Sequence, residues 1–314
     1  MNSKKTFILI ELTLAALLAL LVSFMLKEKS GKDREKVSII VQNSEDDQWT
    51  SFKYGLRMAA EDEEVEAYVV STAAELSAAE VEQLAAQEAQ NGAEALLVQP
   101  VAGVTAEALQ KRTKIPVLLV GGDRSREVEL PSTGPDNRAM GRDLARALLE
   151  DYAGNLDGKT LGLVWTRGES EAAEARRSGF EELLAEEGAK GTVAFAVSGA
   201  DDLTEQPRVN IVVALDDGSL IAAGACAAAN DLHGAVLYGI GSSARAVYYL
   251  DTGAARCLIV PDGFLMGYQS LTEVAEKVRN PLRQMKGTAV QHVVMRRGTL
   301  FTKENQEMLY TMSQ

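Results

Sequence analysis

The sequence predicts an α/β protein with two doubly wound, parallel-sheet (Rossmann-like) lobes, for three reasons. From Val37 onward, short apolar runs alternate with helical stretches of roughly ten to fifteen residues, as in parallel βαβ units whose sheet is covered on both faces. The alternation starts again near residue 136 and produces a second unit of similar size. A chain of 314 residues, 46% of them hydrophobic, is long enough to form two cores.

The first α/β unit is predicted from four continuous apolar runs, and we expect each run to be a buried strand. The strands are expected at 37–41, 66–71, 94–100 and 115–122. Helical stretches separate them, including an alanine-rich one, and are expected at 49–61, 77–92 and 105–112. Strand and helix therefore alternate throughout this unit.

The second unit opens with an amphipathic helix at 135–152, for which Asp136 and Asn137 are candidate caps. Strands are expected at 159–165, 191–197, 209–217 and 235–241, and helices at 169–188 and from Leu220 onward, with an acidic loop in between.

Two later segments suit crossings between the lobes: a strand running into a helix at 256–278, and a strand at 289–302. We therefore expect a multi-stranded hinge. The predicted N-terminal lobe comprises 37–135 and 262–287, and the predicted C-terminal lobe comprises 136–261 and 288–314.

Residues 1–36 read as a separate anchor and tether. Lys4 and Lys5 precede an apolar stretch at 6–26 that contains one charge, Glu11. As a helix rising 1.5 Å per residue, this stretch is long enough to cross a bilayer. An uncleaved transmembrane signal anchor with the rest of the chain extracytoplasmic is the favoured interpretation. A cleaved signal peptide is the alternative, although no clear small-x-small cleavage site follows.

Composition argues against several function classes. The formal charge of −13 and pI near 4.8 disfavour binding to nucleic acid and adsorption to an anionic membrane surface. The histidines and the two cysteines, Cys226 and Cys257, form no cluster with metal-ligand spacing. The cysteines read as small apolar residues, with a disulfide between them left open. Without a nucleophile motif or a glycine-rich phosphate loop, we expect no enzyme, no cofactor and no metal.

The predicted strands end on polar, glycine or aromatic residues. Examples are the runs VQNSEDDQW from Val41 and VVALDDGS from Val212. In open parallel sheets, ligands bind beyond the carboxyl ends of the strands. If the lobes face each other, these ends converge on one cleft. Aromatic faces beside side-chain amides and carboxylates are suited to gripping a sugar.

Short segments from residue 37 to the C-terminus also share order and spacing with one family. They are the aromatic Trp49 followed by Gly55, Ala59 and Ala60, then GAEALLVQP, KIPVLLV, GPDNRAMGRDLA, EARRSGF, LYGIG and the run from LDTGAARCLIVPDG to TEVAEK. This set resembles the type I periplasmic binding proteins, the sugar-binding subunits of ABC importers, whose lobes are shared with LacI-type repressors. The resemblance implies the two-lobed fold, a sugar-like ligand and an ABC permease as partner.

The resemblance places Arg176 where the family has a ligand-binding arginine. Two departures accompany it. The family often has an aspartate where this chain has Gly121 and Gly122, with Asp123 just beyond, and another where Gly241 is followed by a serine. A pentose or hexose is the ligand that the resemblance suggests. Eight positions are candidate ligand contacts: Trp49, Gln99, Asp123, Trp165, Arg176, Asp216, Gly241 and Asp262.

Most of these positions also have a structural interpretation. Trp49 and Trp165 are suited to packing as well as to lining a cleft. Of the adjacent Asp216 and Asp217, one is expected to be a turn residue and the other to accept bonds from a ligand. Asp262 is either a hinge-turn residue or a contact.

The sequence therefore favours an extracytoplasmic solute-binding protein that closes on a sugar-like ligand and delivers it to an ABC importer. A membrane-anchored sensor that signals to a partner such as a histidine kinase is the alternative. A LacI-like regulator would need a helix-turn-helix where this chain has the apolar stretch.

Overall fold

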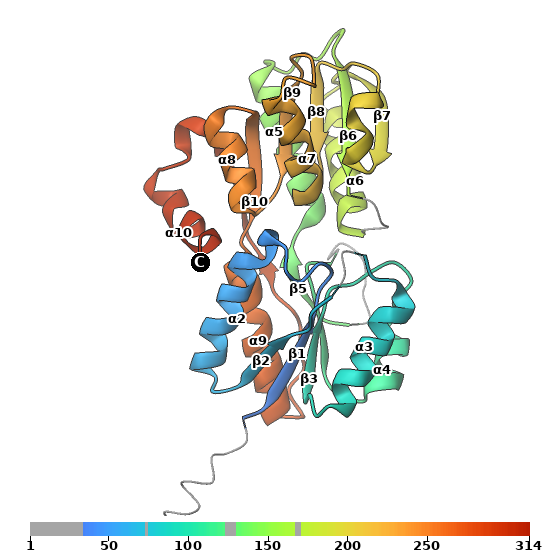
Figure 1. Cartoon of the computed structure of the whole chain (residues 1–314), viewed down its shortest axis with the longest axis vertical. Coiled ribbons are helices and arrows are strands. Elements are labelled where there is room, and N and C mark those ends of the chain that lie inside the picture. The colour runs from blue at the N-terminus through green and yellow to red at the C-terminus, as the bar shows by residue number, and fades with distance from the viewer. Residues whose placement is uncertain (1–33, 73–74, 123–129, 167–170) are drawn as a thin grey trace, which may run out of the picture. The chain divides into compact units, whose positions relative to one another are not determined.

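The computed structural model describes residues 34–72, 75–122, 130–166 and 171–314, and two six-stranded sheets define its two lobes (Figure 1). The predicted two-lobed α/β fold is confirmed. The predicted transmembrane helix lies outside the described residues. Among the helices that are described, none combines the length and the hydrophobicity that a membrane crossing requires.

The N-terminal lobe contains a sheet in the order β11-β5-β4-β3-β1-β2, with every pairing parallel. Its strands are β1 (Lys36–Ile40), β2 (Glu66–Val69), β3 (Ala95–Val98), β4 (Val117–Val120), β5 (Ser132–Pro135) and β11 (Ala289–Val290). The 3₁₀ turn η1 (Asp47–Trp49) leads into α2 (Thr50–Asp62), which covers one face with α9 (Gly263–Arg279). Helices α3 (Ala78–Gln90) and α4 (Ala106–Thr113) cover the other.

The C-terminal lobe repeats this plan with the order β12-β10-β9-β8-β6-β7, in which only β12 is antiparallel to its neighbour. Its strands are β6 (Thr160–Trp165), β7 (Thr192–Ser198), β8 (Ile211–Ala214), β9 (Val236–Ile240), β10 (Ala255–Pro261) and β12 (His292–Arg296). One face is covered by α5 (Asn137–Asp151) and α6 (Glu171–Glu186). The other is covered by α7 (Asp217–Ala228), α8 (Ala244–Thr252) and α10 (Lys303–Met312), with η2 (Ala200–Glu205) and η3 (Arg297–Thr299) as short connections.

Burial follows the apolar runs of the sequence. Every residue of β3, β4 and β8 is buried, because helices cover both faces of each sheet. Edge strand β7 alternates between exposed and half-buried residues instead. Each lobe therefore has two apolar layers, one on either side of its sheet.

Glycines allow one close helix crossing in each lobe. A Cβ on Gly55 of α2 would lie 2.1 Å from the carbonyl oxygen of Phe264 on α9. A Cβ on Gly141 of α5 would lie 1.9 Å from the carbonyl oxygen of Arg176 on α6. Only glycine lets these backbones approach so closely. The second crossing sets the position of Arg176.

The chain crosses between the lobes three times. The first crossing joins β5 to α5, and the second joins β10 to α9 at Asp262. The third separates β11 from β12. Sheet pairing therefore places this lobe boundary between Val290 and His292, whereas the boundary expected from the sequence lay between 287 and 288. The segment 289–302, expected as one strand, thus contributes to both sheets and continues into η3.

Other local differences have physical reasons. Strand β5 has the sequence STGP, which carries no strand signal, and it is buried between β4 and β11. Helix α10 was not anticipated; it ends on Met312, which is buried in the C-terminal lobe. Cys226 and Cys257 are both free, so the disulfide left open by the sequence does not form.

Candidate functional site

The carboxyl ends of β1 and β3 are joined in the N-terminal lobe at the point where the strand order reverses. The amide N–H of Gln42, just after β1, donates to Oε1 of Gln99, just after β3, at 2.8 Å. The indole Nε1 of Trp49 donates to the Gln42 carbonyl oxygen at 3.0 Å. Such a reversal point is where open α/β sheets bind ligands.

The C-terminal lobe has a matching link between the ends of β6 and β8. The amide N–H and the hydroxyl of Thr166 donate to the two carboxylate oxygens of Asp216, at 2.7 and 2.5 Å. Asp216 also accepts from the Ser219 N–H at 2.9 Å and so caps α7. Both of its oxygens are therefore occupied by protein donors, as expected for the turn residue of the aspartate pair.

Asp217 presents the opposite case. It is only 4% exposed, and its Oδ1 accepts from the N–H groups of Ser242 and Ser243 at 2.7 and 2.9 Å. Its Oδ2 has no hydrogen-bond partner among the described residues. Burial raises the pKa of Asp217 to about 6, against the lowering effect of the serine hydrogen bonds. A buried carboxylate oxygen without a donor is costly, so this atom is suited to accept a bond from a ligand hydroxyl.

Gly241 supports this arrangement by its small size. A Cβ at this position would lie 2.7 Å from Oδ1 of Asp217 and 2.9 Å from Leu220. A side chain here would displace the Asp217 carboxylate from the serine amides. The family often has an aspartate near the position of Gly241, after β9. The glycine in this chain is compatible with a site whose carboxylate is that of Asp217, after β8.

Arg176 lies close to this pair of aspartates. Its Nε donates to Oδ1 of Asn137 at 2.8 Å, and its Nη1 donates to the Leu215 carbonyl oxygen at 2.9 Å. Burial lowers its pKa, while the charges of Asp216 and Asp217 act in the opposite direction. Since a guanidinium has five N–H donors, these two bonds within the described structure leave others for a ligand.

Two contacts connect strand-end loops of one lobe to the other. The Ser242 hydroxyl, after β9, donates to the Gln48 carbonyl oxygen in η1 at 3.2 Å. The Nδ2 of the fully buried Asn137 donates to the carbonyl oxygen of Gly122, after β4, at 3.2 Å. The charge of Asp46, two residues before Gln48, also acts on Asp217. The carboxyl ends of the two sheets therefore meet around Asp217, Arg176 and Asn137, which we call the interlobe cluster.

The two tryptophans differ in environment. Trp49 is 6% exposed and packs edge-on against Phe52, with their ring centroids 5.4 Å apart, in the core of the N-terminal lobe. This burial favours its structural interpretation. Trp165 is half-buried at the end of β6, and the guanidinium of Arg177 lies 5.7 Å from its ring centroid.

The remaining candidates divide as follows. Asp262 caps α9 by accepting from the Leu265 N–H at 2.9 Å, at the second crossing between the lobes, and burial raises its pKa. The side chain of Gln99 is engaged by Gln42, as described above. Asp123 lies outside the described residues. As ligand contacts, all eight positions remain predictions.

Sequence reasoning assigned no site role to Asn137 and the two serines after β9. Asn137 was expected only as a cap; Asp136 takes that role by accepting from the Ala139 N–H at 2.9 Å. The sequence signal that could have indicated Asn137 was its position directly after Asp136 in the GPDNR segment. Ser242 and Ser243 act through backbone N–H groups, which any residue type could supply, so no sequence signal marks them.

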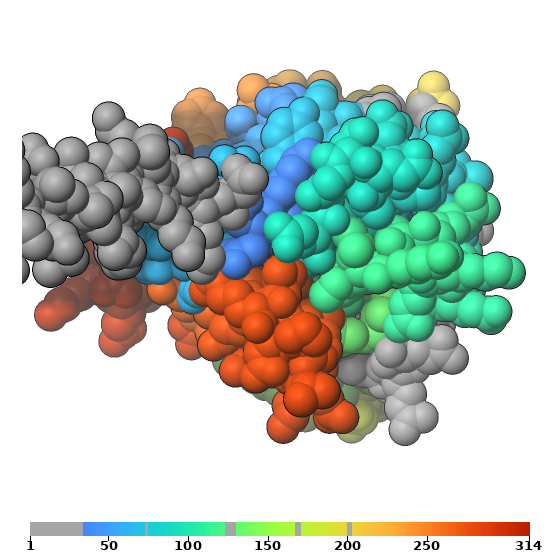
Figure 2. Space-filling view, turned by 90° about the horizontal axis from the view of Figure 1, so that it is seen from below, coloured from blue at the N-terminus to red at the C-terminus, as the bar shows by residue number. Residues whose placement is uncertain are grey.

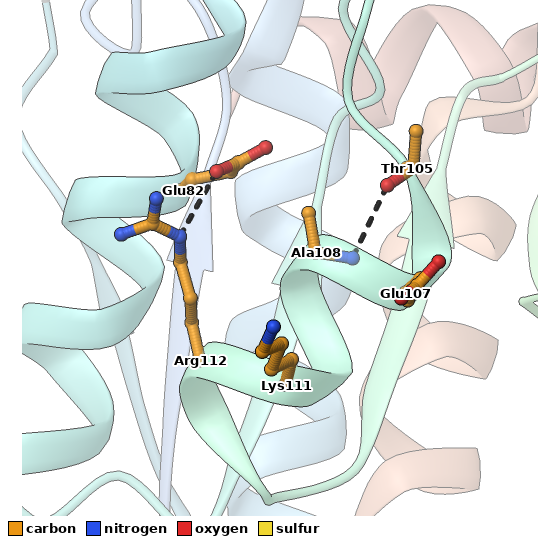
Figure 3. A pocket seen from close by; sticks show the side chains of 6 residues that line it. All are labelled: Glu82, Thr105, Glu107, Ala108, Lys111 and Arg112. Carbon is orange, nitrogen blue, oxygen red and sulfur yellow. Dashed lines mark hydrogen bonds and ion pairs between the residues drawn. The ribbon is translucent and has the colours of Figure 1, made fainter.

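A surface pocket of about 500 Å³ lies elsewhere, between α3 and α4 (Figure 3). In it, Arg112 pairs with Glu82 at 3.0 Å, and the Thr105 hydroxyl caps α4 by accepting from the Ala108 N–H. Two of its charged side chains, Arg112 and Glu82, are thus paired with each other, and the pocket lies on helices rather than at strand ends. The interlobe cluster is the better candidate.

Comparisons with known proteins identify the family of the chain. A family model described as "Periplasmic binding protein domain" matches residues 37–280. No curated protein matches the sequence.

Solved structures also match the chain. Because their sequence identity to it is low, they support the fold alone. A carbohydrate transporter solute-binding protein from Agrobacterium radiobacter, in complex with D-arabinose, is 18% identical with a TM-score of 0.78, covering 89% of this chain and 100% of its own. GanP, a glucose-galactose binding protein from Geobacillus stearothermophilus, is 19% identical with a TM-score of 0.73, covering 86% and 100%. XylFII in the XylFII–LytSN complex is 13% identical with a TM-score of 0.73, covering 84% and 98%.

Proposed function

Since the chain belongs to the periplasmic binding protein family, we propose that it captures a sugar or a similar polar small molecule between its lobes. The observation that carries this proposal is the unpartnered Oδ2 of Asp217 beside Arg176. A carboxylate at the start of α7 and a guanidinium on α6 can accept from and donate to the hydroxyls of one sugar ring. Rotation of the lobes about the three crossings would admit and enclose it.

The structural relatives support this ligand class. Two of the proteins described above are solute- or sugar-binding proteins, one of them holding D-arabinose. The family's members are generally binders rather than enzymes, and the proposal requires no catalytic group, cofactor or metal.

Thermal unfolding with a ligand panel tests the proposal. The purified chain is heated with pentoses, hexoses, nucleosides and furanose signals. A true ligand binds only the native state and raises the midpoint temperature. Asp217→Asn should reduce or abolish the rise for that ligand. If no member of the panel shifts the midpoint, the sugar-binding proposal is wrong.

We also propose that residues 1–36 anchor the protein to the membrane with the lobes outside the cytoplasm. The support is the apolar stretch at 6–26, followed by a charged tether. Membranes washed at alkaline pH should retain the protein, and protease added to intact spheroplasts should digest the lobes. Release of the whole protein by the wash would contradict the anchor.

Delivery to an ABC permease is the role proposed for the closed form. Signalling to a membrane sensor is the second candidate, supported by the match to XylFII in complex with LytSN. A strain that lacks this protein distinguishes the two roles, provided that the transporter for the identified ligand is expressed from a constitutive promoter. A delivery protein would be needed for uptake of labelled ligand. A sensor would be needed only for the transcriptional response to it.

A further inference from the structure

The segment 277–286 has a composition unlike the rest of the chain. Its sequence, KVRNPLRQMK, contains four basic residues and no acidic one, in a protein of net charge −13. It comprises the last turn of α9 and the loop toward β11, which we call the 280–286 loop. Leu282 in this loop is 94% exposed. One exposed leucine needs no explanation by itself, so the argument depends on how the loop is held.

The 280–286 loop is fixed on both sides of Leu282. The ammonium of Lys277 donates to the carbonyl oxygens of Pro281 and Arg283, at 2.6 and 2.7 Å. Farther along, the Lys286 N–H donates to Oε1 of Glu273 at 2.6 Å. The leucine is therefore held outward by an ordered backbone, which is how an apolar anchor is prepared for an external partner.

The loop lies at the end of the N-terminal lobe where the tether enters. In parallel sheets the strand starts and the helix ends share one edge. Arg279, at the end of α9, pairs with Glu63, just after α2, at 2.7 Å, and Lys36, at the start of β1, lies 3.9 Å from Glu88 near the end of α3. Figure 2 views this end, with the orange atoms of α9 and the loop beside the blue and teal atoms of β1 and α3.

A shallow apolar groove of about 270 Å³ adjoins the loop. Its apolar lining includes Ile115, Leu130 and Met285, and the basic Lys114 and Lys277 also line it. Apolar side chains bordered by basic ones suit the boundary between acyl chains and anionic headgroups. Two basic residues of the segment 277–286 are paired with acidic partners, Arg279 with Glu63 and Arg283 with Glu276, so the attraction to lipid is expected to be moderate.

The length of the tether limits the distance between the N-terminal lobe and a membrane that holds the apolar stretch. Residues 27–35 separate the apolar stretch from β1, and at about 3.5 Å per residue they span at most about 30 Å. A bilayer holding the stretch 6–26 would therefore lie within that distance of the start of β1. The net negative charge opposes adsorption of the whole protein, but the basic segment 277–286 lies at the end of the lobe to which the tether connects.

We propose that the 280–286 loop docks on the anionic lipid surface, with Leu282 inserted at the headgroup level and the neighbouring basic residues on lipid phosphates. This inference rests on the membrane anchor of the proposed function and not on the ligand. It orients the N-terminal lobe with its helix ends toward the bilayer and its strand ends away from it.

Fluorescence from a label at position 282 tests the docking. The full chain carrying Cys226→Ala and Leu282→Cys is labelled with an environment-sensitive dye and reconstituted into vesicles of phosphatidylglycerol and phosphatidylcholine. Cys257 is fully buried and should not react. The matched control is Phe301→Cys, which is 68% exposed after η3 in the C-terminal lobe.

We expect blue-shifted emission and quenching by nitroxide-labelled lipid at 282, and neither at 301. Replacing phosphatidylglycerol by phosphatidylcholine, or combining Arg283→Glu with Lys286→Glu, should lower the quenching at 282 at least about threefold. Equal quenching at 282 and 301 in vesicle-bound protein would overturn the docking while leaving the anchor intact. Failure of the chain to sediment with vesicles would overturn both, while the ligand-induced thermal shift remains a separate measurement.

Discussion

Replacing Asp217 by asparagine should make the protein more stable at neutral pH and a poorer binder. The asparagine keeps an oxygen for the Ser242 and Ser243 amides and removes a buried charge whose second oxygen lacks a donor. Sites that sacrifice stability for binding respond in this way. A residue that served only the fold would lose stability on substitution.

The magnitude follows from the pKa of Asp217. Its ordinary value is 3.8 and the folded value is about 6, so the folded state binds the proton more tightly than the unfolded state. The wild type therefore loses stability as the pH rises from about 4 to above about 6. At 1.36 kcal/mol per pKa unit, the loss is about 3 kcal/mol. Asp217→Asn should remove this dependence and raise the midpoint temperature at pH 8 by about 5 °C or more.

The assay is thermal unfolding from pH 4 to pH 8, together with ligand titration at pH 7.5. Ligand affinity should fall at least about tenfold, because the substitution replaces a charged acceptor by an amide donor. Asp216→Asn is the matched control. It places an amide against the Thr166 N–H and should destabilise by about 1–3 kcal/mol. If Asp217→Asn follows the wild-type pH profile and binds ligand normally, the reasoning about this carboxylate is wrong.

Three further substitutions follow from the packing and the contacts. Gly141→Ala should destabilise by more than about 2 kcal/mol in urea unfolding, because its Cβ would clash with the Arg176 carbonyl; Gly298→Ala, with open space around it, should change stability by less than about 0.5 kcal/mol. Arg176→Lys should lower ligand affinity about tenfold by calorimetry, since an ammonium cannot reproduce the bonds of the guanidinium. Ser51→Ala removes the 2.8 Å hydrogen bond between its hydroxyl and that of Thr311 on α10 and should cost about 1 kcal/mol in the same unfolding assay.

The opposite results would each contradict a different feature of the structure. A neutral Gly141→Ala would mean that α5 and α6 do not cross as closely as described. Unchanged affinity in Arg176→Lys would remove the arginine from the interlobe cluster. An unaltered unfolding curve for Ser51→Ala would mean that α10 does not stabilise the N-terminal lobe through α2.

The periodic part of the fold was predictable from the sequence, because buried parallel strands must be continuously apolar. The run IVVA of β8 and the run VLLV of β4 are examples. Strand β5 was not predictable, since its STGP sequence pairs only because β4 and β11 enclose it. The segment 289–302 was expected at a crossing between the lobes, but as one strand. Its division into β11 and β12 could not be predicted, because neighbouring residues belong to different sheets only once the hinge exists.

The candidate site was predictable as a location more than as a set of side chains. Strand ends indicated the edge of each sheet at which the interlobe cluster lies, but the eight candidate positions include Asp216, which caps α7, and omit Asp217. Which aspartate is which depends on Thr166, fifty residues earlier in the chain. The role of Asn137 depends on a helix crossing that only Gly141 and Gly179 permit, and neither relationship has a local sequence signal.

The three crossings also impose an order on biogenesis. The middle stretch, from α5 to β10, is contiguous and can begin to fold as soon as it has been synthesised. The N-terminal lobe is synthesised first yet must wait for α9 and β11, which come from a late part of the chain. Until α9 has been synthesised, the sheet face that α9 covers together with α2 is only partly covered, and its exposed apolar residues are open to aggregation.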